Sequence, residues 1–286
     1  LLVPAVLAFA IDSTVQRRQK ALVGARSVPY APRPARGRDA LLLAFVLVVS
    51  AYLLLVIGMA AYGSVVKFWP YNLSFTLNHY TYGFEEAGVE NAYRNSLTMA
   101  AWCAVVGALL TFAGAYWLEK TRGADLVRPI VRLQAMLPMA IPGLVLGIGY
   151  ILFFNHPANP LNVLYGTMGI LVLSTIVHFY SSSHLTAVTA LKQLDNEFES
   201  VSASLKVPFY KTFWRVTVPV CLPSIIDISR YYFVNAMTTI SAVVFLYSPK
   251  TMLAAISIVQ LDEAGAIGSA AAMATLIVVT SGVVTL

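Results

Sequence analysis

Long apolar runs separated by short polar segments dominate the sequence. A helix needs about 20 apolar residues to cross the hydrocarbon core of a membrane, and it leaves no backbone group of the spanning segment unpaired. The pattern therefore predicts an all-α, polytopic transmembrane helix bundle. The predicted spans are Leu1–Ile11 (the end of an upstream helix), Ala40–Val65, Ser96–Leu118, Val131–Phe154, Leu164–Ser183, Val220–Leu246 and Ala270–Leu286.

The composition favours lipid as the surrounding medium. Hydrophobic residues make up 58% of the chain, charged residues 11%, and the mean hydropathy is +0.74. Soluble proteins carry about a quarter charged residues, because their surfaces face water. The net charge of +6 arises largely from basic residues beside apolar runs. That placement is typical of cytoplasmic loops of membrane proteins and argues against a nucleic-acid partner.

The distribution of Lys and Arg predicts which side of the membrane each loop faces. Cytoplasmic loops carry an excess of these residues, and alternate loops along this chain are richer in them than their neighbours. We expect segments 12–39, 119–130 and 184–219 inside the cell, and segments 66–95, 155–163 and 247–269 outside it.

The predicted domain organisation has three parts. Residues 1–11 end an upstream transmembrane helix, and residues 12–39, which combine basic residues with spaced prolines, form a cytoplasmic linker. Residues 40–286 form a transmembrane domain with about six spans. Both ends of the chain fall inside apolar runs, so we expect it to be a fragment of a longer polypeptide.

The loop 184–219 contains a short amphipathic helix. Phe198, Val201 and Leu205 recur at helical spacing and form an apolar stripe on an otherwise polar segment. A loop helix with such a stripe and no core of its own favours docking into the groove of a partner protein. The alternative is a helix that lies on the membrane surface.

The same loop resembles the Glu-Ala-Ala loop of the permeases of ATP-binding-cassette (ABC) importers. The run Lys211–Pro219 matches the aromatic and basic second part of that motif, and Glu199 matches the acidic residue just before Glu-Ala-Ala. Residues 200–202 replace Glu-Ala-Ala itself, and Lys206 stands where the family has Gly. The resemblance implies that this loop is the coupling helix, which docks on the ATPase subunit through Glu199, Ser200, Val201, Ala203, Leu205 and Lys206.

The third complete span carries a second resemblance. Leu137–Gly149 is rich in Pro and Gly and looks like the corresponding helix in the iron, polyamine and phosphonate branch of these permeases. Gly143 and Gly147 also suit close packing between helices, which is the simpler reading of the glycines. The stretches 202–211 and 229–239 look most like 2-aminoethylphosphonate permeases, with ferric-iron permeases as the nearest competitor.

The resemblance implies a type I ABC importer permease (MetI-like) fold, and a chain that is the second half of a fused two-repeat permease of the bacterial inner membrane. The implied function is a translocation path for a small solute, 2-aminoethylphosphonate first, with ferric iron or a polyamine as alternatives. The implied partners are a dimer of ABC ATPase subunits, a periplasmic solute-binding protein, the other permease half of the same full-length chain, and the lipid bilayer.

One predicted span carries polar residues at membrane depth. Asp227, Tyr231, Asn235 and Thr238 follow near-helical spacing, and Arg230 flanks them. Polar groups in hydrocarbon are expensive and face the bundle interior or an aqueous path. Two readings are open: these residues line part of the translocation path, or an Asp227–Arg230 pair and interhelical hydrogen bonds hold the bundle together. We favour the structural reading.

The sequence carries no enzyme motif. A phosphate-binding Gly-x-x-x-x-Gly-Lys-Ser/Thr loop, a His-Glu-x-x-His and a Gly-x-Ser-x-Gly are all absent, so we predict no catalytic residue and expect ATP hydrolysis on a separate subunit. The histidines lack ligand spacing and the cysteines lie apart in apolar runs, so no metal site and no cofactor is predicted. A secondary transporter is the alternative from a different class, but it does not account for the amphipathic loop.

Overall fold

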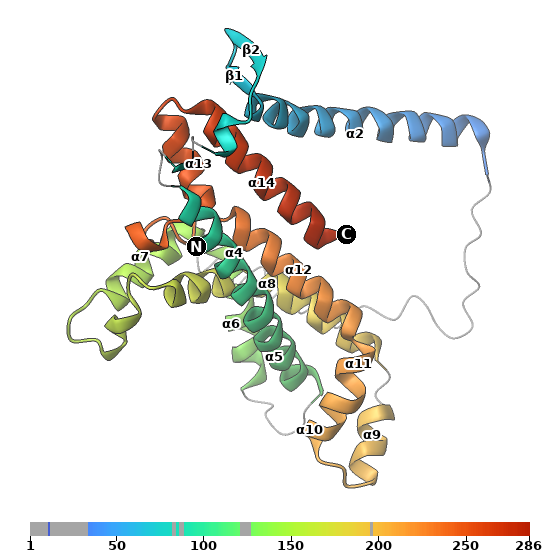
Figure 1. Ribbon diagram of the computed structural model, residues 1–286. Coiled ribbons are helices and arrows are strands. Elements are labelled where there is room, and N and C mark those ends of the chain that lie inside the picture. Colours follow the sequence, from blue (N-terminus) through green and yellow to red (C-terminus); the bar gives the residue numbers. More distant parts are fainter. Residues whose placement is uncertain (1–10, 12–33, 82–83, 86–88, 121–126, 195–196) are drawn as a thin grey trace.

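The computed structural model describes residue 11 and residues 34–81, 84–85, 89–120, 127–194 and 197–286 (Figure 1). The predicted upstream helix end and most of the predicted linker therefore lie outside the described residues. The described part is a helical bundle with a small two-stranded sheet, which confirms the all-α fold class of a membrane helix bundle.

The helices and strands follow one another as a series of long helices with short connections. In chain order they are α2 (Arg36–Ser64), β1 (Val66–Phe68), β2 (Asn72–Phe75), α4 (Glu90–Trp102), α5 (Ala108–Lys120), α6 (Arg128–Ala140), α7 (Gly143–Phe154), α8 (Met168–Gln193), α9 (Glu197–Ser204), α10 (Phe209–Thr212), α11 (Val218–Val220), α12 (Leu222–Thr238), α13 (Ala254–Glu263) and α14 (Ile267–Thr285).

Helix α8 lies inside the bundle and packs against α5, α6 and α12. Its buried residues include the polar Ser174 and Ser181. Both hydroxyls donate to backbone carbonyls of neighbouring segments, Ser174 to Ala242 O at 2.8 Å and Ser181 to Ala135 O at 2.7 Å. A helix surrounded by protein can satisfy such groups, which explains why α8 tolerates more polar residues than a helix that faces lipid.

Helices α4 and α5 form one continuous 31-residue span, Glu90–Lys120, with a π-helical turn at Cys103–Gly107. Gly107 lies against the ring of Tyr232 on α12, where an added Cβ would meet ring carbons at 2.9 Å. Tyr232 is fully buried, and its hydroxyl lies 2.9 Å from the hydroxyl of Thr111. The π-helical turn therefore coincides with a close approach between α12 and this span.

The predicted span Val131–Phe154 is wrong as a single helix. It is divided into α6 and α7, which are bent by 111° relative to each other. The residue before a proline is pushed out of the α region, and Ile141, which precedes Pro142, is extended with φ −105° and ψ 121°. Helix α7 then begins at Gly143, directly after the proline.

Two glycines of α7 lie against the segment that follows α12. A Cβ at Gly143 would meet the side chain of Ser241, and a Cβ at Gly147 would come within 3.2 Å of the Phe245 ring. The two glycines are therefore positions of close packing, although the neighbour is a segment of turns and not the helix that the prediction expected. The contact holds the broken span against the segment after α12.

The predicted span Val220–Leu246 is too long, because α12 ends at Thr238. The next residue, Thr239, is extended with ψ 136°, as β-branched residues favour. The residues after it form turns that include buried Ala242, whose carbonyl accepts the Ser174 hydroxyl. The segment 247–269, predicted as an outside loop, contains α13, whose first turn is buried and which packs against α4 and α14.

The remaining helix boundaries differ from the prediction by less. Helix α8 runs to Gln193, past the predicted end at Ser183, so the following loop is shorter than expected. Helix α2 begins at Arg36, so the last residues of the predicted linker are helical. Helix α14 begins at Ile267, close to its predicted start.

Within the described residues, 3 helices are long and apolar enough to cross a membrane: α2, the α4–α5 span and α14. The bent pair α6–α7 adds one more if it is counted as a single span. The apolar stretch of α2 is entirely unburied, and Figure 1 shows this helix extending away from the bundle. Its C-terminal end packs against α14. The full number of spans stays a prediction.

Candidate coupling segment and polar pocket

Helix α9 ends in a turn that places Lys206 in a left-handed backbone conformation. The Val207 amide donates to Ser202 O at 2.9 Å and the Lys206 amide donates to Ala203 O at 3.1 Å, the two bonds that close a helix in the Schellman motif. Lys206 has φ 53°, a value that favours glycine. This is the position where the resemblance places a glycine, so the backbone keeps that conformation although the residue differs.

The apolar stripe of α9 is uncovered. Phe198, Val201 and Leu205 are 48%, 56% and 70% exposed. Figure 1 shows α9 and α10 together at one end of the molecule, beyond the end of α5. The stripe therefore has no core within the described chain and is free to meet another surface. Of the other predicted coupling residues, Ser200, Ala203 and Lys206 are also exposed, and the side chain of Glu199 lies outside the described residues.

Side-chain contacts connect the segment that contains α9 and α10 to the bundle. Phe213, in the π-helical turn that follows α10, has its ring centroid 4.8 Å from that of Tyr116 and 6.0 Å from that of Phe112. Both partners are buried residues of α5. At the other end of the segment, Lys120 Nζ donates to Leu194 O at 3.2 Å. The segment is thus anchored to the end of α5 on both sides of α9.

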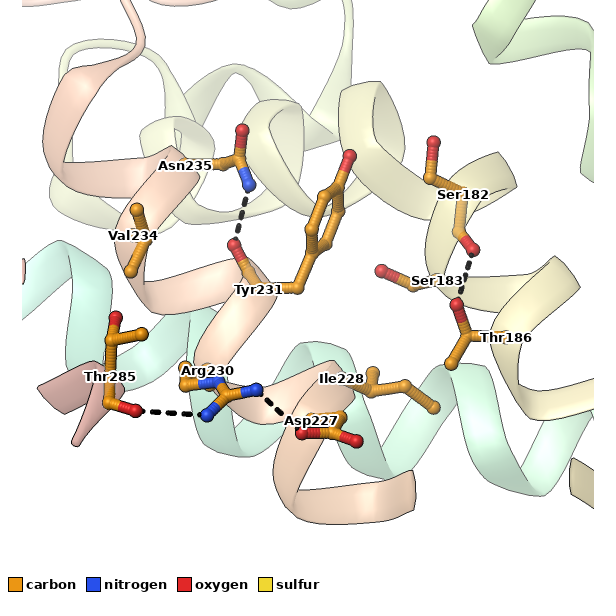
Figure 2. A pocket seen from close by; sticks show the side chains of 10 residues that line it. All are labelled: Ser182, Ser183, Thr186, Asp227, Ile228, Arg230, Tyr231, Val234, Asn235 and Thr285. Atoms are coloured by element: carbon orange, nitrogen blue, oxygen red, sulfur yellow. Dashed lines mark hydrogen bonds and ion pairs between the residues drawn. The ribbon is translucent and has the colours of Figure 1, made fainter. Parts of the chain in front are cut away.

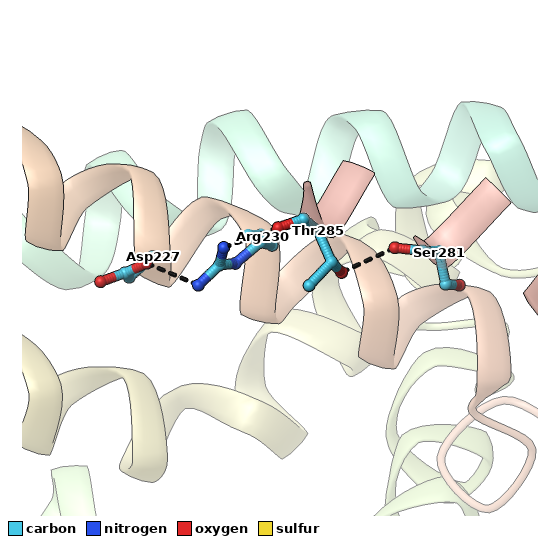
Figure 3. A network of polar contacts seen from close by, with 4 residues as sticks. All are labelled: Asp227, Arg230, Ser281 and Thr285. Atoms are coloured by element: carbon cyan, nitrogen blue, oxygen red, sulfur yellow. Dashed lines mark hydrogen bonds and ion pairs between the residues drawn. The ribbon is translucent and has the colours of Figure 1, made fainter. Parts of the chain in front are cut away.

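Asp227 and Arg230 form an ion pair on α12. Arg230 Nη2 lies 2.8 Å from Asp227 Oδ1, and Arg230 Nη1 donates to Thr285 O at 3.0 Å. Thr285 belongs to α14, and its own hydroxyl donates to Ser281 O at 2.6 Å, so this chain of contacts connects two helices (Figure 3). The side chains of Arg230 and Asp227 are 40% and 55% exposed, so the pair lies at the surface of the described bundle. The Asp227–Arg230 pair predicted from the sequence is formed.

The ion pair borders an open pocket of about 350 Å³, lined by residues of α8, α12 and α14 (Figure 2). Asp227, Arg230, Tyr231 and Asn235 all line it, whereas Thr238, at the end of α12, does not. Three hydroxyls of α8 were not predicted as part of the site, although a serine run at 181–183 within an apolar span was a signal for them. The other lining residues are Ser182, Ser183, Thr186, Ile228, Val234 and Thr285.

The polar face of α12 makes few of the predicted interhelical hydrogen bonds. The Asn235 amide donates to Tyr231 O at 2.8 Å and the Thr238 hydroxyl donates to Val234 O at 3.1 Å, both within the helix itself. Tyr232, on another face of α12, makes the buried contact to α5 instead. The residues predicted as a polar stripe therefore contribute more to the pocket than to the hydrogen bonds between helices.

The part of the chain that the structure describes holds no group of three or more His, Cys, Asp or Glu side chains placed to bind a metal ion. His79 Nε2 lies 2.9 Å from Val66 O, which gives this histidine a backbone partner. Cys103 and Cys221 are buried and unbridged.

The fold and the exposed segment together define a class of membrane transport protein. The chain belongs to the family described as the binding-protein-dependent transport system inner membrane component, whose model matches residues 107–286. The matched region runs from the π-helical turn before α5 to the end of α14 and so contains both the α9 segment and the pocket. The chain is therefore an integral membrane protein of a transport-permease family.

Two kinds of curated relatives resemble this chain. The ferric transport system permease protein FbpB of Actinobacillus pleuropneumoniae is 31% identical over 225 residues, which are 78% of this chain and 32% of that protein. A protein of Salmonella paratyphi A named for 2-aminoethylphosphonate transport, PhnV, is 26% identical over 204 residues, which are 71% of this chain and 75% of that protein. The chain thus spans about a third of the length of two ferric relatives that it matches, 32% of one and 30% of the other.

A solved structure shares the fold. A bacterial ABC transporter involved in the import of the acidic polysaccharide alginate has a chain that superposes with a TM-score of 0.69 at 18% identity, covering 87% of this chain and 93% of that one. At this identity the likeness shows the fold alone. It confirms the predicted ABC importer permease (MetI-like) architecture.

Proposed function

We propose that this chain is a permease unit of an ABC importer in the bacterial inner membrane and forms part of the path for a small solute. A solute-binding protein delivers the solute from outside, and a dimer of separate ATPase subunits hydrolyses ATP on the cytoplasmic side. One observation carries the proposal: α9 presents an uncovered apolar stripe at the end of a bundle that belongs to the binding-protein-dependent family.

The coupling role of α9 rests on how its stripe is held. The stripe is exposed, so burial against a partner would stabilise a complex. The closing turn at Lys206 and the contacts of Phe213 with α5 fix the segment to the bundle, so a movement of the docked partner would be transmitted to α5 through packed side chains. The stripe faces away from its own chain's core, as a docking surface requires.

A charge on the stripe tests this role. We expect Val201→Asp to abolish docking of the ATPase subunit that meets this α9, because an unpaired charge buried at a contact costs several kcal/mol. The measurement is co-purification of the ATPase with the full-length permease, together with ATP hydrolysis stimulated by the binding protein in lipid vesicles. Membrane insertion should be unchanged, because Val201 is exposed outside the apolar spans.

A matched control lies on the same helix. Ser204→Asp adds the same charge about a quarter turn away from the stripe. Ser204 is exposed, and its hydroxyl donates to Ser200 O of the same helix. It should keep ATPase docking close to that of the unmodified protein. Equal retention of the ATPase by both variants would remove α9 from the coupling role and leave the family membership standing.

The pocket is our candidate for part of the solute path. It is open, it reaches α8, α12 and α14, and it combines a carboxylate, a guanidinium and several hydroxyls. A small charged or zwitterionic solute cannot cross hydrocarbon unaided, so a path for it must offer such groups between helices. The paired charges Asp227 and Arg230 suit a solute that carries both signs, because each end could replace one partner of the ion pair.

For the cargo we propose 2-aminoethylphosphonate, a zwitterion that suits this pair of charges. Two features support it: the resemblance of stretches 202–211 and 229–239, and the 75% coverage of a relative named for that solute. Ferric iron is the second candidate, favoured by the higher identity, 31%, of a ferric relative. The two cargoes differ in charge and size, so a single uptake experiment separates them.

The experiment measures uptake of both cargoes by vesicles that contain the full-length permease, its ATPase and its binding protein. We expect uptake of the phosphonate but not of ferric iron, and a loss of that uptake in Arg230→Ala with protein abundance and ATPase docking intact. Iron uptake in place of phosphonate uptake would reverse the cargo assignment. A simple loss of protein in Arg230→Ala would return Arg230 to a structural role.

We also propose that the chain is one half of a fused two-repeat permease. The 225 residues matched in one ferric relative are only 32% of its length, so that relative is long enough to hold two units of this size. The described chain presents α9 as a candidate docking segment for one ATPase subunit, and a second subunit would need a second segment. A full-length chain carrying Val201→Asp in this half alone should therefore keep one docking site.

A further inference from the structure

The hairpin formed by β1 and β2 carries a cluster of uncovered aromatic side chains. Phe68, Trp69, Tyr71 and Phe75, the hairpin aromatics, are 59%, 40%, 84% and 76% exposed. The rings of Phe68 and Tyr71 stack with centroids 5.9 Å apart, so part of this surface is preformed. Neither the coupling role of α9 nor the pocket uses this surface.

The hairpin begins where α2 ends. Between Asp39 and Lys67 the chain has no charged residue, and the apolar stretch of α2 is entirely unburied. A helix of 29 residues is about 43 Å long, more than the hydrocarbon core of about 30 Å, so α2 crosses the core and its C-terminal end emerges near the headgroups. The hairpin therefore starts near the depth of the lipid headgroups.

Several contacts fix the hairpin at this depth. The ring of Tyr62, in the last turns of α2, packs edge to face with Trp69 at 6.1 Å and with Phe75 at 6.5 Å between centroids. On the other side His79 Nε2 lies 2.9 Å from Val66 O, and the His79 ring packs directly on Gly268 of α14. Figure 1 shows the hairpin projecting sideways from the end of α2 rather than continuing along its axis. A hairpin held in this way runs along the membrane surface if α2 crosses the membrane.

The chemistry of the hairpin fits a lipid–water boundary. Trp and Tyr are enriched at that boundary, because their rings are apolar at one end and polar at the other. The segment 66–84 carries a single Lys and no Asp or Glu. The exposed Lys67 can reach phosphate groups of lipid headgroups while its stem stays on the apolar surface.

We propose that the hairpin aromatics lie in the headgroup region of the bilayer and hold the neighbouring ends of α2 and α14 at that depth. The occupant of this surface is phospholipid, met at the boundary of its headgroups and acyl chains. The proposal rests on α2 crossing the membrane and does not depend on the cargo or on the ATPase.

Depth-dependent quenching of tryptophan fluorescence tests the proposal on the full-length protein in vesicles of phosphatidylcholine and phosphatidylglycerol. The described chain has 4 tryptophans, so Trp102→Phe, Trp117→Phe and Trp214→Phe together leave Trp69 as the reporter in this part of the protein; tryptophans elsewhere in the full-length chain are replaced as well. We expect nitroxide labels on the headgroup to quench Trp69 more than labels near the end of the acyl chain, and aqueous iodide to quench it weakly. The control protein keeps only Trp102, an exposed residue near the middle of the α4–α5 span, which the deep label should quench most.

A second reporter tests the orientation of the hairpin. In the protein without native tryptophans, Tyr71→Trp places the indole at the most exposed of the hairpin aromatics. A hairpin that lies along the surface gives it the same shallow quenching as Trp69. Strong iodide quenching of either reporter without lipid quenching would overturn the proposal, as would protection from iodide that appears only when the solute-binding protein is added. The measurement needs neither cargo nor ATP, so its failure leaves the proposed permease function untouched.

Discussion

At position 206 the backbone adopts a conformation that the side chain does not favour. A left-handed residue with a Cβ costs about 1 kcal/mol relative to glycine, and Lys206 has φ 53°. The hydrogen bonds from the Val207 and Lys206 amides to Ser202 O and Ala203 O require this conformation. They close the helix and turn the chain toward Pro208. The conformation is therefore set by the turn as a whole and not by the residue that occupies it.

Glycine at this position should stabilise the turn. We expect Lys206→Gly to slow hydrogen exchange of the Leu205 and Val207 amides, by a factor that corresponds to about 1 kcal/mol of local opening free energy. The measurement is amide exchange by mass spectrometry on the purified protein. Lys206→Val provides the opposite case, since a β-branched residue is disfavoured at positive φ, and exchange there should accelerate. Unchanged exchange in both variants would show that the turn does not limit the opening of α9.

The residues of the pocket show what a single sequence can and cannot reveal about a site. Asp227 and Arg230 are recognisable because ionisable residues in an apolar span are unusual. The pairing at 2.8 Å follows from their i, i+3 spacing on one helix. The serine run at 181–183 on α8 was visible in the sequence. Its place in the pocket could not be predicted, because that depends on how α8 is rotated against α12 by packing.

At the scale of elements, the lengths of the apolar runs predicted where spans lie but not where a span is broken. The apolar run 131–154 is continuous in hydropathy, yet Pro142 forces Ile141 into an extended conformation and the helix turns by 111°. The proline was visible in the sequence, but prolines are tolerated within some membrane helices. Helix α13 was not predicted, because its apolar stretch is too short for a membrane span. It is a short helix, and tertiary contacts with α4 and α14 decide its burial.

The contact between α7 and the segment after α12 predicts a difference between two glycines of the same helix. A Cβ at Gly143 would come within 2.9 Å of Ser241 Cβ and 3.0 Å of His178 Cε1. Overpacking of this kind costs about 1–3 kcal/mol, so Gly143→Ala should lower the midpoint of thermal unfolding in detergent. The expected cause is displacement of the segment after α12.

Gly149 on the same helix serves as the control. Nothing lies within 4 Å of the position where its Cβ would be, and Ala exceeds Gly in helix propensity by up to about 1 kcal/mol. Gly149→Ala should therefore leave the unfolding midpoint unchanged or raise it. A fall of the same size in both variants would mean that the loss comes from α7 itself and not from its contact with Ser241.

At the scale of the whole molecule, the two ends of the bundle differ in chemistry. One end holds α9, α10, the end of α5 and the start of α6, and these elements carry basic residues such as Lys120, Arg132 and Lys211. The opposite end holds the hairpin and α13, with few Lys or Arg. This arrangement is the spatial counterpart of the alternating charge bias in the sequence, which predicts that the α9 end is cytoplasmic.

Labelling of single cysteines tests this orientation of the whole molecule. In the full-length protein with Cys103, Cys221 and any further cysteines replaced by alanine, Asn78→Cys and Ser204→Cys place thiols at exposed positions at opposite ends of the bundle. We expect an impermeant maleimide to label Asn78→Cys in intact spheroplasts and Ser204→Cys only after permeabilisation. The reason is that polar loops cannot cross the membrane once the apolar helices are inserted. The excess of Lys and Arg at the α9 end therefore predicts the side of the membrane on which each end of the bundle lies. The reverse pattern would invert the map and move α9 away from any cytoplasmic ATPase. Labelling of both thiols in intact spheroplasts would instead show that α9 and the hairpin lie on the same side, which contradicts the three spans that the sequence predicts between them.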